Sequence, residues 1–154
     1  MKRVLITGMS GTGKSTLLDE LGRRGYPVVD TDVGGYIHRV GDEYLWRGPR
    51  IEELLSRTWP AGVVFVQGTV RNQVAFYPRF DHIVLLSAPQ EVLLSRLQVR
   101  TDNPYGKTPA EVAEVLDNLT HVEPLLRAAA SLEIVTTSPV DEIADAVLAH
   151  VGCN

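Results

Sequence analysis

Cysteine and long hydrophobic runs are nearly absent from this chain of 154 residues. The lone cysteine, Cys153, cannot form an internal disulfide bond, so the sequence predicts a protein of a reducing compartment. No apolar stretch approaches the roughly 20 residues that a membrane-spanning helix needs. Because Lys2 and Arg3 lead straight into an apolar strand, we expect no signal peptide, no membrane partner and a cytoplasmic location.

Positive charge is also scarce. The chain carries 15 Lys and Arg residues against 19 Asp and Glu residues, which gives a formal net charge of −4. This balance offers no general attraction for nucleic acid or anionic lipid, so we expect neither as a partner. Hydrophobic residues make up 44% and charged residues 22%, the composition of an ordinary globular domain. We therefore expect one domain over residues 1–154, since this length suffices for a single core.

Glycine, by contrast, is concentrated near the start of the chain. Residues Gly8 to Ser15 read GMSGTGKS and fit the phosphate-binding pattern G-x-x-x-x-G-K-[ST] at every fixed position. An apolar run precedes the pattern and a helical pattern follows it, as a phosphate-binding loop requires. In such a loop backbone N–H groups face the phosphates, Lys14 reaches the β- and γ-phosphates, and the Ser15 hydroxyl holds Mg²⁺. The predicted ATP ligands of this loop are Gly8, Ser10, Gly11, Thr12, Gly13, Lys14, Ser15 and Thr16.

Apolar strands alternate with helical patterns along the rest of the chain. The expected strands cover residues 3–7, 26–30, 62–67, 82–86 and 132–136. The expected helices cover 14–23 and 51–57 and follow capping boxes at Ser87–Gln90 and Thr108–Glu111. Pro124 should kink or restart the helix it interrupts, and a last helix begins after Ser138-Pro139. Strands that each lead into a helix indicate an α/β fold with a parallel sheet covered on both faces. Ligands of such sheets gather beyond the strand C-termini, which selects the loops at 8–15, 30–36, 67–73 and 100–107.

Two acidic residues, Asp30 and Asp32, close the second expected strand. Alternation in an extended chain places both on one side, facing the phosphate loop across the end of the sheet. One of them can hold a water of Mg²⁺ while the other orients or deprotonates an acceptor hydroxyl; alternatively, one of them only caps a turn. Many phosphate-loop proteins carry their Mg²⁺-ordering Asp on a different strand, but here the strand at 62–67 ends in Gln67. This difference favours Asp30 and Asp32 as the functional acids and disfavours a motor or switch ATPase.

The pattern at Gly8–Ser15, the Asp30-x-Asp32 pair and the arginines before Asn103 together resemble the small phosphate-loop (P-loop) kinases. This group includes shikimate kinases, gluconate kinases and nucleoside monophosphate kinases. The resemblance implies a three-layer fold with a five-stranded parallel sheet in the order 2-3-1-4-5, an acceptor-binding insert near residues 34–60 and a short lid near 100–108. It also implies ATP and Mg²⁺ as cofactors, a monomer, Asp30 as the acid that orders Mg²⁺, and Asp32 as the acid that contacts the acceptor hydroxyl.

The expected acceptor side combines arginines with residues at strand ends. The segment from Gly68 to Arg71 is similar to the Gly-x-x-Arg with which monophosphate kinases grip the phosphate of the acceptor. We therefore predict that Gly68 and Arg71 bind an anionic acceptor, with Asn72 and Gln73 as further candidates. Between residues 36 and 50, aromatic and cationic side chains, with Arg39 the strongest candidate, either enclose a polar acceptor or form an ordinary solvated surface.

Arg96 and Arg100 are four residues apart and therefore share one face of the expected helix before the lid. A kinase lid excludes water and brings cations onto the transferring phosphoryl group. Their place in the family pattern favours this role for both arginines over simple solvation of the helix. In the family, the loop at residues 137–140 lies near the adenine, which makes Pro139 a predicted ATP contact.

These residues together predict an ATP- and Mg²⁺-dependent small-molecule kinase, a phosphotransferase whose catalytic residues are Lys14, Asp32, Arg96 and Arg100. The acceptor is a hydroxyl or a phosphate: Arg71 favours a nucleoside or nucleotide, whereas the acidic pair favours a sugar or hydroxy acid. The alternative is a nucleotide-binding regulatory or switch module that hydrolyses ATP slowly or not at all. The acidic charge balance and the lack of a basic stripe disfavour an ATPase that works on nucleic acid.

Overall fold

The computed structural model describes residues 1–101 and 103–153, so Asp102 of the expected lid and Asn154 lie outside the described residues. Its strands are β1(Lys2–Gly8), β2(Val28–Asp30), β3(Ile37–Val40), β4(Glu43–Trp46), β5(Val63–Gln67), β6(His82–Ser87) and β7(Leu132–Val135). Its α-helices are α1(Lys14–Arg23), α2(Gly48–Ser56), α3(Gln90–Val99), α4(Pro109–His121), α5(Glu123–Ala129) and α6(Val140–Val151), and its 3-10 helices are η1(Pro60–Gly62) and η2(Arg71–Arg79).

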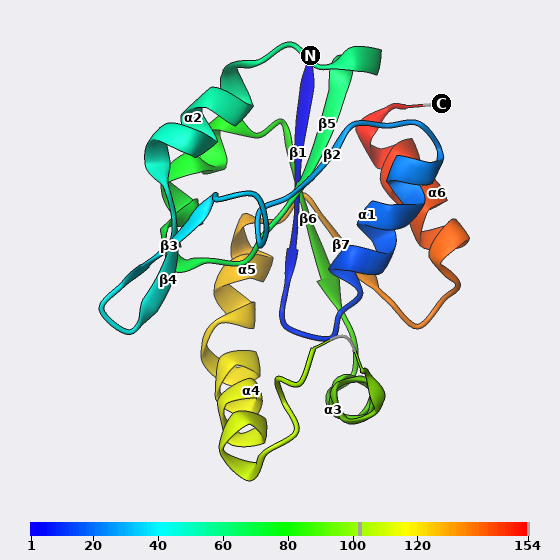
Figure 1. Cartoon of the computed structure of the whole chain (residues 1–154). Helices are drawn as coiled ribbons and strands as arrows, with labels where there is room; N and C mark the ends of the chain where they lie inside the picture. Colours follow the sequence, from blue (N-terminus) through cyan, green and yellow to red (C-terminus); the bar gives the residue numbers. More distant parts are fainter. Residues whose placement is uncertain (102, 154) are drawn as a thin grey trace.

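Five of the strands form one parallel sheet in the order β2-β5-β1-β6-β7. Counted along the chain without the separate β3–β4 pair, this order is 2-3-1-4-5, so the expected topology is confirmed. The register pairs Asp30 of β2 with Gln67 of β5, and Gln67 with Ile6 of β1. The carboxyl ends of these strands therefore meet at one edge, which Figure 1 shows at the end of the sheet away from the two chain termini.

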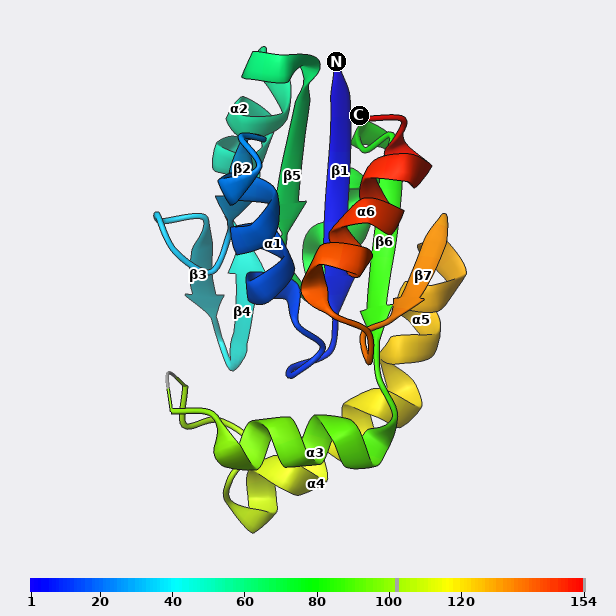
Figure 2. The ribbon, with the colours of Figure 1, turned by 90° about the vertical axis from the view of Figure 1, so that its right-hand side faces the viewer.

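Both faces of the sheet are covered, as the apolar strands predict. Alternate residues of each strand point to opposite faces. On one face, Val4 and Ile6 pack with apolar residues of α1 and α6; on the other, Leu5 packs with Ile51 and Leu54 of α2. Figure 2 shows α1 and α6 side by side across the first of these faces. The sheet is thus fixed from both sides, and its carboxyl edge is a rigid platform for the loops that follow each strand.

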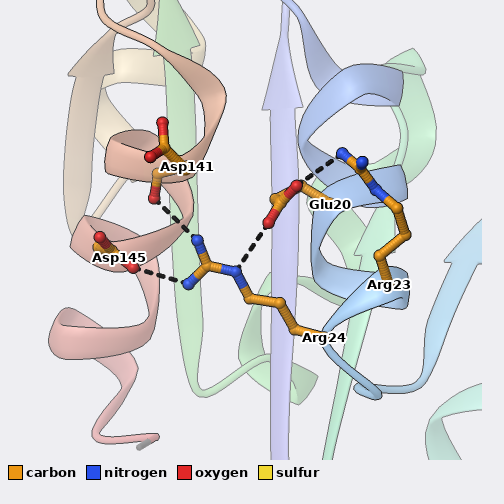
Figure 3. Close-up of polar contacts among 5 residues, drawn as sticks. All are labelled: Glu20, Arg23, Arg24, Asp141 and Asp145. Carbon is orange, nitrogen blue, oxygen red and sulfur yellow. Dashed lines mark hydrogen bonds and ion pairs between the residues drawn. The ribbon is translucent and has the colours of Figure 1, made fainter.

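An ion-pair network joins α1 to α6 on the outside of the molecule (Figure 3). The Arg24 guanidinium contacts Glu20 at 2.9 Å and Asp145 at 2.7 Å, and it donates a hydrogen bond to the main-chain oxygen of Asp141 at 3.0 Å. Since α1 begins at the glycine-rich loop, this network holds the helix behind that loop against the last helix of the chain.

Two local expectations were incomplete or wrong. The mixed segment at 34–60 contains the antiparallel β3–β4 hairpin with Gly41-Asp42 at its turn, a two-residue hairpin signal that the sequence analysis missed. Ser87 does not open a helix: α3 begins after Pro89, and the Ser87 hydroxyl instead donates to Glu133 on β7 at 2.7 Å. Ser87 is the last residue of β6, so its backbone belongs to the sheet.

The other helix signals are confirmed. Thr108 caps α4 through a capping box with Glu111, and the helical pattern restarts at α5 with Pro124 in the first turn. Within the residues that the structure describes, no helix has both the length and the apolar character to cross a membrane.

Candidate functional site

A hollow of about 510 Å³ lies at the carboxyl edge of the sheet. Its wall is formed by the glycine-rich loop, the ends of β2 and β5, helix α3 and the start of α6. The predicted site residues that line it are Ser10, Gly11, Thr12, Gly13, Lys14, Ser15, Thr16, Asp32, Arg96 and Arg100. The predicted residues outside its lining are Gly8, Asp30, Arg39, Gly68, Arg71 and Pro139.

The path of the glycine-rich loop is fixed at its first residue. A Cβ atom on Gly8 would lie 2.4 Å from the Leu86 carbonyl oxygen of β6 and 2.9 Å from Thr12 Oγ1, so only glycine fits there. Thr69, which follows β5, holds the same residue: Gly8 N donates to Thr69 Oγ1 at 3.2 Å, and that hydroxyl donates to Gly8 O at 2.7 Å. Gly8 therefore shapes the loop from behind instead of lining the hollow.

Lys14 begins α1 and folds back over the loop. Its Nζ donates to the main-chain oxygens of Gly8 at 2.7 Å and Met9 at 3.1 Å. Burial of the ammonium group lowers the pKa of Lys14 to about 8; the carboxylate of Asp32 opposes this shift, and Arg100 adds to it. A cation partly stripped of water and satisfied only by carbonyl oxygens is poised to bind an anion with more charge.

A second set of hydrogen bonds joins the glycine-rich loop to Thr136, the residue that follows β7. The Thr136 hydroxyl donates to Thr12 O at 2.7 Å, and Arg96 NH1 donates to Gly11 O and to Thr136 Oγ1, each at 3.0 Å. The Arg96 guanidinium also donates to the main-chain oxygen of Thr136. Arg96 thus positions the loop backbone while it lines the hollow. Thr136 lines the hollow and was not predicted as a site residue, although a polar residue at the end of an apolar strand was an available signal.

The two acids of the second strand take different places. Asp32 lines the hollow, whereas Asp30 is not among the lining residues. Asp30 Oδ1 accepts a hydrogen bond from the backbone N–H of Asp32 at 2.9 Å, the turn-capping contact weighed as an alternative for one of these acids. The Gln67 Nε2 group donates to both carboxylates, at 3.1 Å to Asp32. One buried amide therefore joins the two acids at the end of β5.

Arg100 lies at the end of α3 and organises the loop after it. Its Nε donates to Asn103 O at 3.1 Å and its NH2 donates to Tyr105 O at 3.0 Å, while Lys107 Nζ donates to Arg100 O at 2.7 Å. The described part of the expected lid is therefore folded around the guanidinium that lines the hollow.

The predicted acceptor residues near β5 have structural partners. A Cβ atom on Gly68 would lie 2.6 Å from Thr31 Oγ1 and 2.8 Å from the Trp46 ring, so tight packing explains this glycine. Asn72 accepts from Trp46 N at 2.9 Å and donates to Trp46 O at 3.0 Å. The Gln73 amide is buried and bonded to the residues around it. These side chains fix the hairpin and the loop after β5.

Arg39 and Arg71 extend along the β3–β4 hairpin into solvent. Arg71 forms an ion pair of 2.5 Å with Glu43, and its side chain is 81% exposed. Arg39 lies 3.8 Å from Asp42 and donates to Gly41 O at 2.9 Å. The structure therefore brings neither arginine to the hollow.

The residues of the hollow fit a Mg²⁺ ion that arrives with phosphate groups. Mg²⁺ prefers oxygen ligands and keeps several of its waters. Ser15 and Asp32 offer a hydroxyl and a carboxylate, and Gln67 Oε1 is a buried acceptor without a protein partner that a metal-bound water can satisfy. No group of three or more His, Cys, Asp or Glu among the described residues can hold a metal ion. Phosphate oxygens would therefore have to complete its coordination.

Comparison with known proteins gives a family and several relatives. Residues 4–117 match the AAA_18 family, described as an AAA domain. A protein of Pseudomonas fluorescens (strain Pf0-1) named as a nucleotide-binding protein is 25% identical over 143 residues, which are 89% of this chain and 50% of that protein. A nucleotide-binding protein of Neisseria meningitidis serogroup B is 28% identical over 120 residues, 75% of this chain and 42% of that protein. The chain spans about half the length of the curated relatives it matches.

Solved structures share the fold over nearly the whole chain. A shikimate kinase from Acinetobacter baumannii in complex with shikimate has a TM-score of 0.70 and 22% identity, and the match covers 98% of this chain and 93% of that one. A gluconokinase from Sinorhizobium meliloti 1021 has a TM-score of 0.61 and 18% identity over 98% and 91% of the two chains. The sheet order and the solved neighbours show that the chain has the fold of the small P-loop kinases. The family match over residues 4–117 shows that the chain belongs to the AAA_18 family.

Proposed function

We propose that this protein is an ATP- and Mg²⁺-dependent small-molecule kinase. It transfers the γ-phosphoryl group to a hydroxyl or phosphate of a small acceptor, as a monomer in the cytoplasm. The observation that carries this proposal is one hollow in which Lys14, Asp32 and Arg100 meet the amides of a phosphate-binding loop. Cations and a carboxylate around one phosphate site are the groups that in-line phosphoryl transfer needs.

The nucleotide side of the hollow would bind ATP through the loop at residues 8–16. Lys14 would leave the main-chain oxygens of Gly8 and Met9 for the β- and γ-phosphates, which replace weak neutral acceptors with charged ones. Arg96 would keep the loop backbone in place, and Pro139 would lie beside the base. Arg100 would add positive charge to the transferring group as its loop closes.

The acidic side would hold Mg²⁺ and the acceptor. When bound, Mg²⁺ neutralises charge on the phosphate oxygens. Ser15 and Asp32 would hold it, because both line the hollow, whereas Asp30, the acid expected to order the metal, is not among the lining residues. Asp32 would also orient the acceptor hydroxyl and take up its proton, whereas Asp30 supports Asp32 through the backbone N–H.

The acceptor class divides into two subcases. The acidic pair favours a sugar or hydroxy acid, and the solved neighbours named shikimate kinase and gluconokinase support that subcase. An anionic nucleoside phosphate would need Arg71, Arg39 and the loop at Gly68 to face the acceptor. Since both arginines lie along the hairpin outside the hollow, that subcase requires the hairpin to move.

A nucleotide-binding regulatory module with slow or no hydrolysis is the second candidate. The curated relatives are named only as nucleotide-binding proteins, and Arg39 and Arg71 are already paired with acids of the β3–β4 hairpin. Both observations suit a protein that binds ATP without a dedicated acceptor.

ADP release over a panel of sugars, hydroxy acids, nucleosides and monophosphates separates the two candidates. The kinase proposal expects one chemical class to raise turnover at least about tenfold, and Lys14→Ala to abolish that rise. Arg23→Ala, an exposed change on the same helix, is the matched control and should leave turnover unchanged. If ATP binds but no acceptor on the panel raises turnover, the kinase proposal fails and the regulatory module takes its place.

A further inference from the structure

Gln67 is the one buried amide that joins the two site acids among the described residues. It ends β5, its relative exposure is 0%, and it lines the hollow. Its backbone is fixed by Thr31, whose N–H and hydroxyl donate to Gln67 O at 3.2 Å and 2.8 Å. The side chain therefore extends from a rigid point of the sheet into the wall of the site.

The orientation of this amide follows from its surroundings. Nε2 carries two hydrogens, and it donates to Asp30 and to Asp32. With the amide reversed, Oε1 would face the two carboxylates. All three groups are hydrogen-bond acceptors, so no hydrogen bond could form among them and they would repel one another. The amide thus holds two like charges close together that would otherwise repel each other.

This orientation leaves Gln67 Oε1 buried without a hydrogen-bond partner in the protein. A buried unpaired acceptor is costly and rare, and it calls for a donor. Gln67 lines the hollow, so a ligand that draws its side chain toward the hollow can supply that donor. The neighbouring carboxylates favour a cation, and a water bound to a cation is a strong donor.

We propose that Gln67 is a positioning residue of this site, resting on the function proposed above. Its Nε2 links Asp32 to Asp30 and so fixes the carboxylate that receives Mg²⁺, and its Oε1 accepts a hydrogen bond from a water that the metal retains. An amide, and not a third carboxylate, ends β5 beside the two acids. The metal is therefore held weakly until phosphate oxygens complete its shell, and it enters with the nucleotide.

Mn²⁺ binding, followed by electron paramagnetic resonance with and without a non-hydrolysable ATP analogue, tests this role apart from turnover. Gln67→Met keeps the length of the side chain and removes both polar functions. We expect it to weaken Mn²⁺ binding to the nucleotide complex by about 10-fold or more, while metal-free nucleotide affinity changes less than about twofold. Gln67→Glu replaces the donor with a third carboxylate, so Mn²⁺ should bind the nucleotide-free protein about 10-fold more tightly.

Gln73→Met is the matched control. Gln73 is also a buried glutamine, but its amide is satisfied by Thr7, Tyr77 and Val70 and lies outside the lining of the hollow. This variant should lower thermal stability without a change in Mn²⁺ affinity. Equal Mn²⁺ affinities for Gln67→Met, Gln73→Met and the unaltered protein would overturn the role of Gln67, and so would a Gln67→Glu protein that binds Mn²⁺ no more tightly.

The unaltered protein gives a second reading that needs no variant. In nuclear magnetic resonance spectra, the side-chain NH₂ signals of Gln67 should shift when Mg²⁺ is added to the nucleotide complex, while those of Gln73 stay in place. If the Gln67 signals do not shift on addition of Mg²⁺, the inference about Gln67 is refuted while the proposed function still stands. A protein that binds neither the nucleotide analogue nor Mn²⁺ refutes both the inference and the proposed function.

Discussion

The proposed nucleotide side and the proposed acceptor side of this molecule are built in different ways. On the nucleotide side, buried and half-buried side chains hold the loop backbone: Thr69 binds Gly8, Thr136 binds Thr12, and Arg96 binds the same loop. On the acceptor side, Arg39 of β3 and Arg71 of η2 form exposed ion pairs with Asp42 in the hairpin turn and Glu43 of β4.

The nucleotide side is therefore already in a binding-ready arrangement, whereas the acceptor side must still rearrange before its arginines can bind a ligand. Hydrogen bonds inside a protein keep their geometry because water cannot compete with them, whereas an exposed ion pair contributes at most about 1 kcal/mol and exchanges readily. The nucleotide half is therefore ready for its ligand. The acceptor half has cations to offer only after a ligand or a movement releases them from their acids.

The largest effect is expected from the loop lysine. Lys14→Ala removes the cation proposed to bind the β- and γ-phosphates. The acceptor-dependent rate of phosphoryl transfer should therefore fall by about 10³-fold or more. Steady-state ADP release with a responsive acceptor measures it, and thermal unfolding checks that the variant is folded. A folded variant with more than about one tenth of the normal rate would break the claim that the nucleotide half is prepared around Lys14.

The two acids should differ sharply although they are only two residues apart. Asp32→Asn removes the acid that faces the hollow and should lower the transfer rate by about 10²-fold or more while ATP still binds. Asp30→Asn keeps an acceptor oxygen for the Asp32 N–H, so its loss should be smaller. Comparison of kcat and of ATP affinity for both variants tests this order. Equal losses would mean that both acids touch the ligands.

Arg96 tests the buried ties of the nucleotide half. Arg96→Met removes three hydrogen bonds to the loop and to Thr136, so we expect about a 10-fold weaker ATP affinity and about 2 kcal/mol less stability. Arg127→Met is the control, because Arg127 pairs with Glu123 and Glu133 on α5 and β7 outside the lining of the hollow. Arg127→Met should lower stability without changing ATP affinity. If it weakens ATP binding as much as Arg96→Met does, the claim that Arg96 holds the loop for ATP is refuted.

The pH dependence of stability reports the buried Lys14 ammonium. Its pKa is lowered from 10.5 to about 8 in the folded protein, so between these values the unfolded chain binds more protons than the folded one. The contribution of Lys14 to stability should therefore rise with pH across that window and be unfavourable below it. Urea unfolding of the ligand-free protein in EDTA, at pH 7 to 10, should show this rise, and Lys14→Met should lack it. Parallel curves for the two proteins would place the ammonium in water.

The smallest effects belong to the exposed hairpin. Glu43→Gln releases Arg71 from its ion pair and should change stability by less than about 1 kcal/mol. If Arg71 binds the acceptor, the same change should lower the acceptor KM a few-fold, and Arg71→Met should raise it by a similar factor. Acceptor titrations measure both. Unchanged KM values in both variants would remove Arg71 from the acceptor site and sharpen the contrast between the two halves.

The sequence predicts most residues that line the hollow because their signals are local. The loop motif lies within eight consecutive residues, and Asp32 follows an apolar strand whose end must lie at the carboxyl edge. The five apolar runs likewise predict the sheet, and the resemblance to P-loop kinases supplies its strand order, which the structure confirms.

The remaining features depend on contacts between distant parts of the chain. Thr136 lies 124 residues from Thr12, and Gln67 lies 35 residues from Asp32. No pattern within a short stretch of sequence predicts that residues so far apart in the chain form hydrogen bonds. The same cause explains why Gly68 and Asn72 were predicted as acceptor ligands: both stand at a strand end, but Trp46 packs against one and hydrogen-bonds the other.

A crystal structure with Mg²⁺ and a non-hydrolysable ATP analogue tests the central claim most directly. The account predicts a triphosphate in the hollow, with Lys14 Nζ moved from the oxygens of Gly8 and Met9 to the phosphates and Asp32 facing the metal. A hollow without nucleotide, with Lys14 still bound to its own loop under saturating analogue, would contradict it.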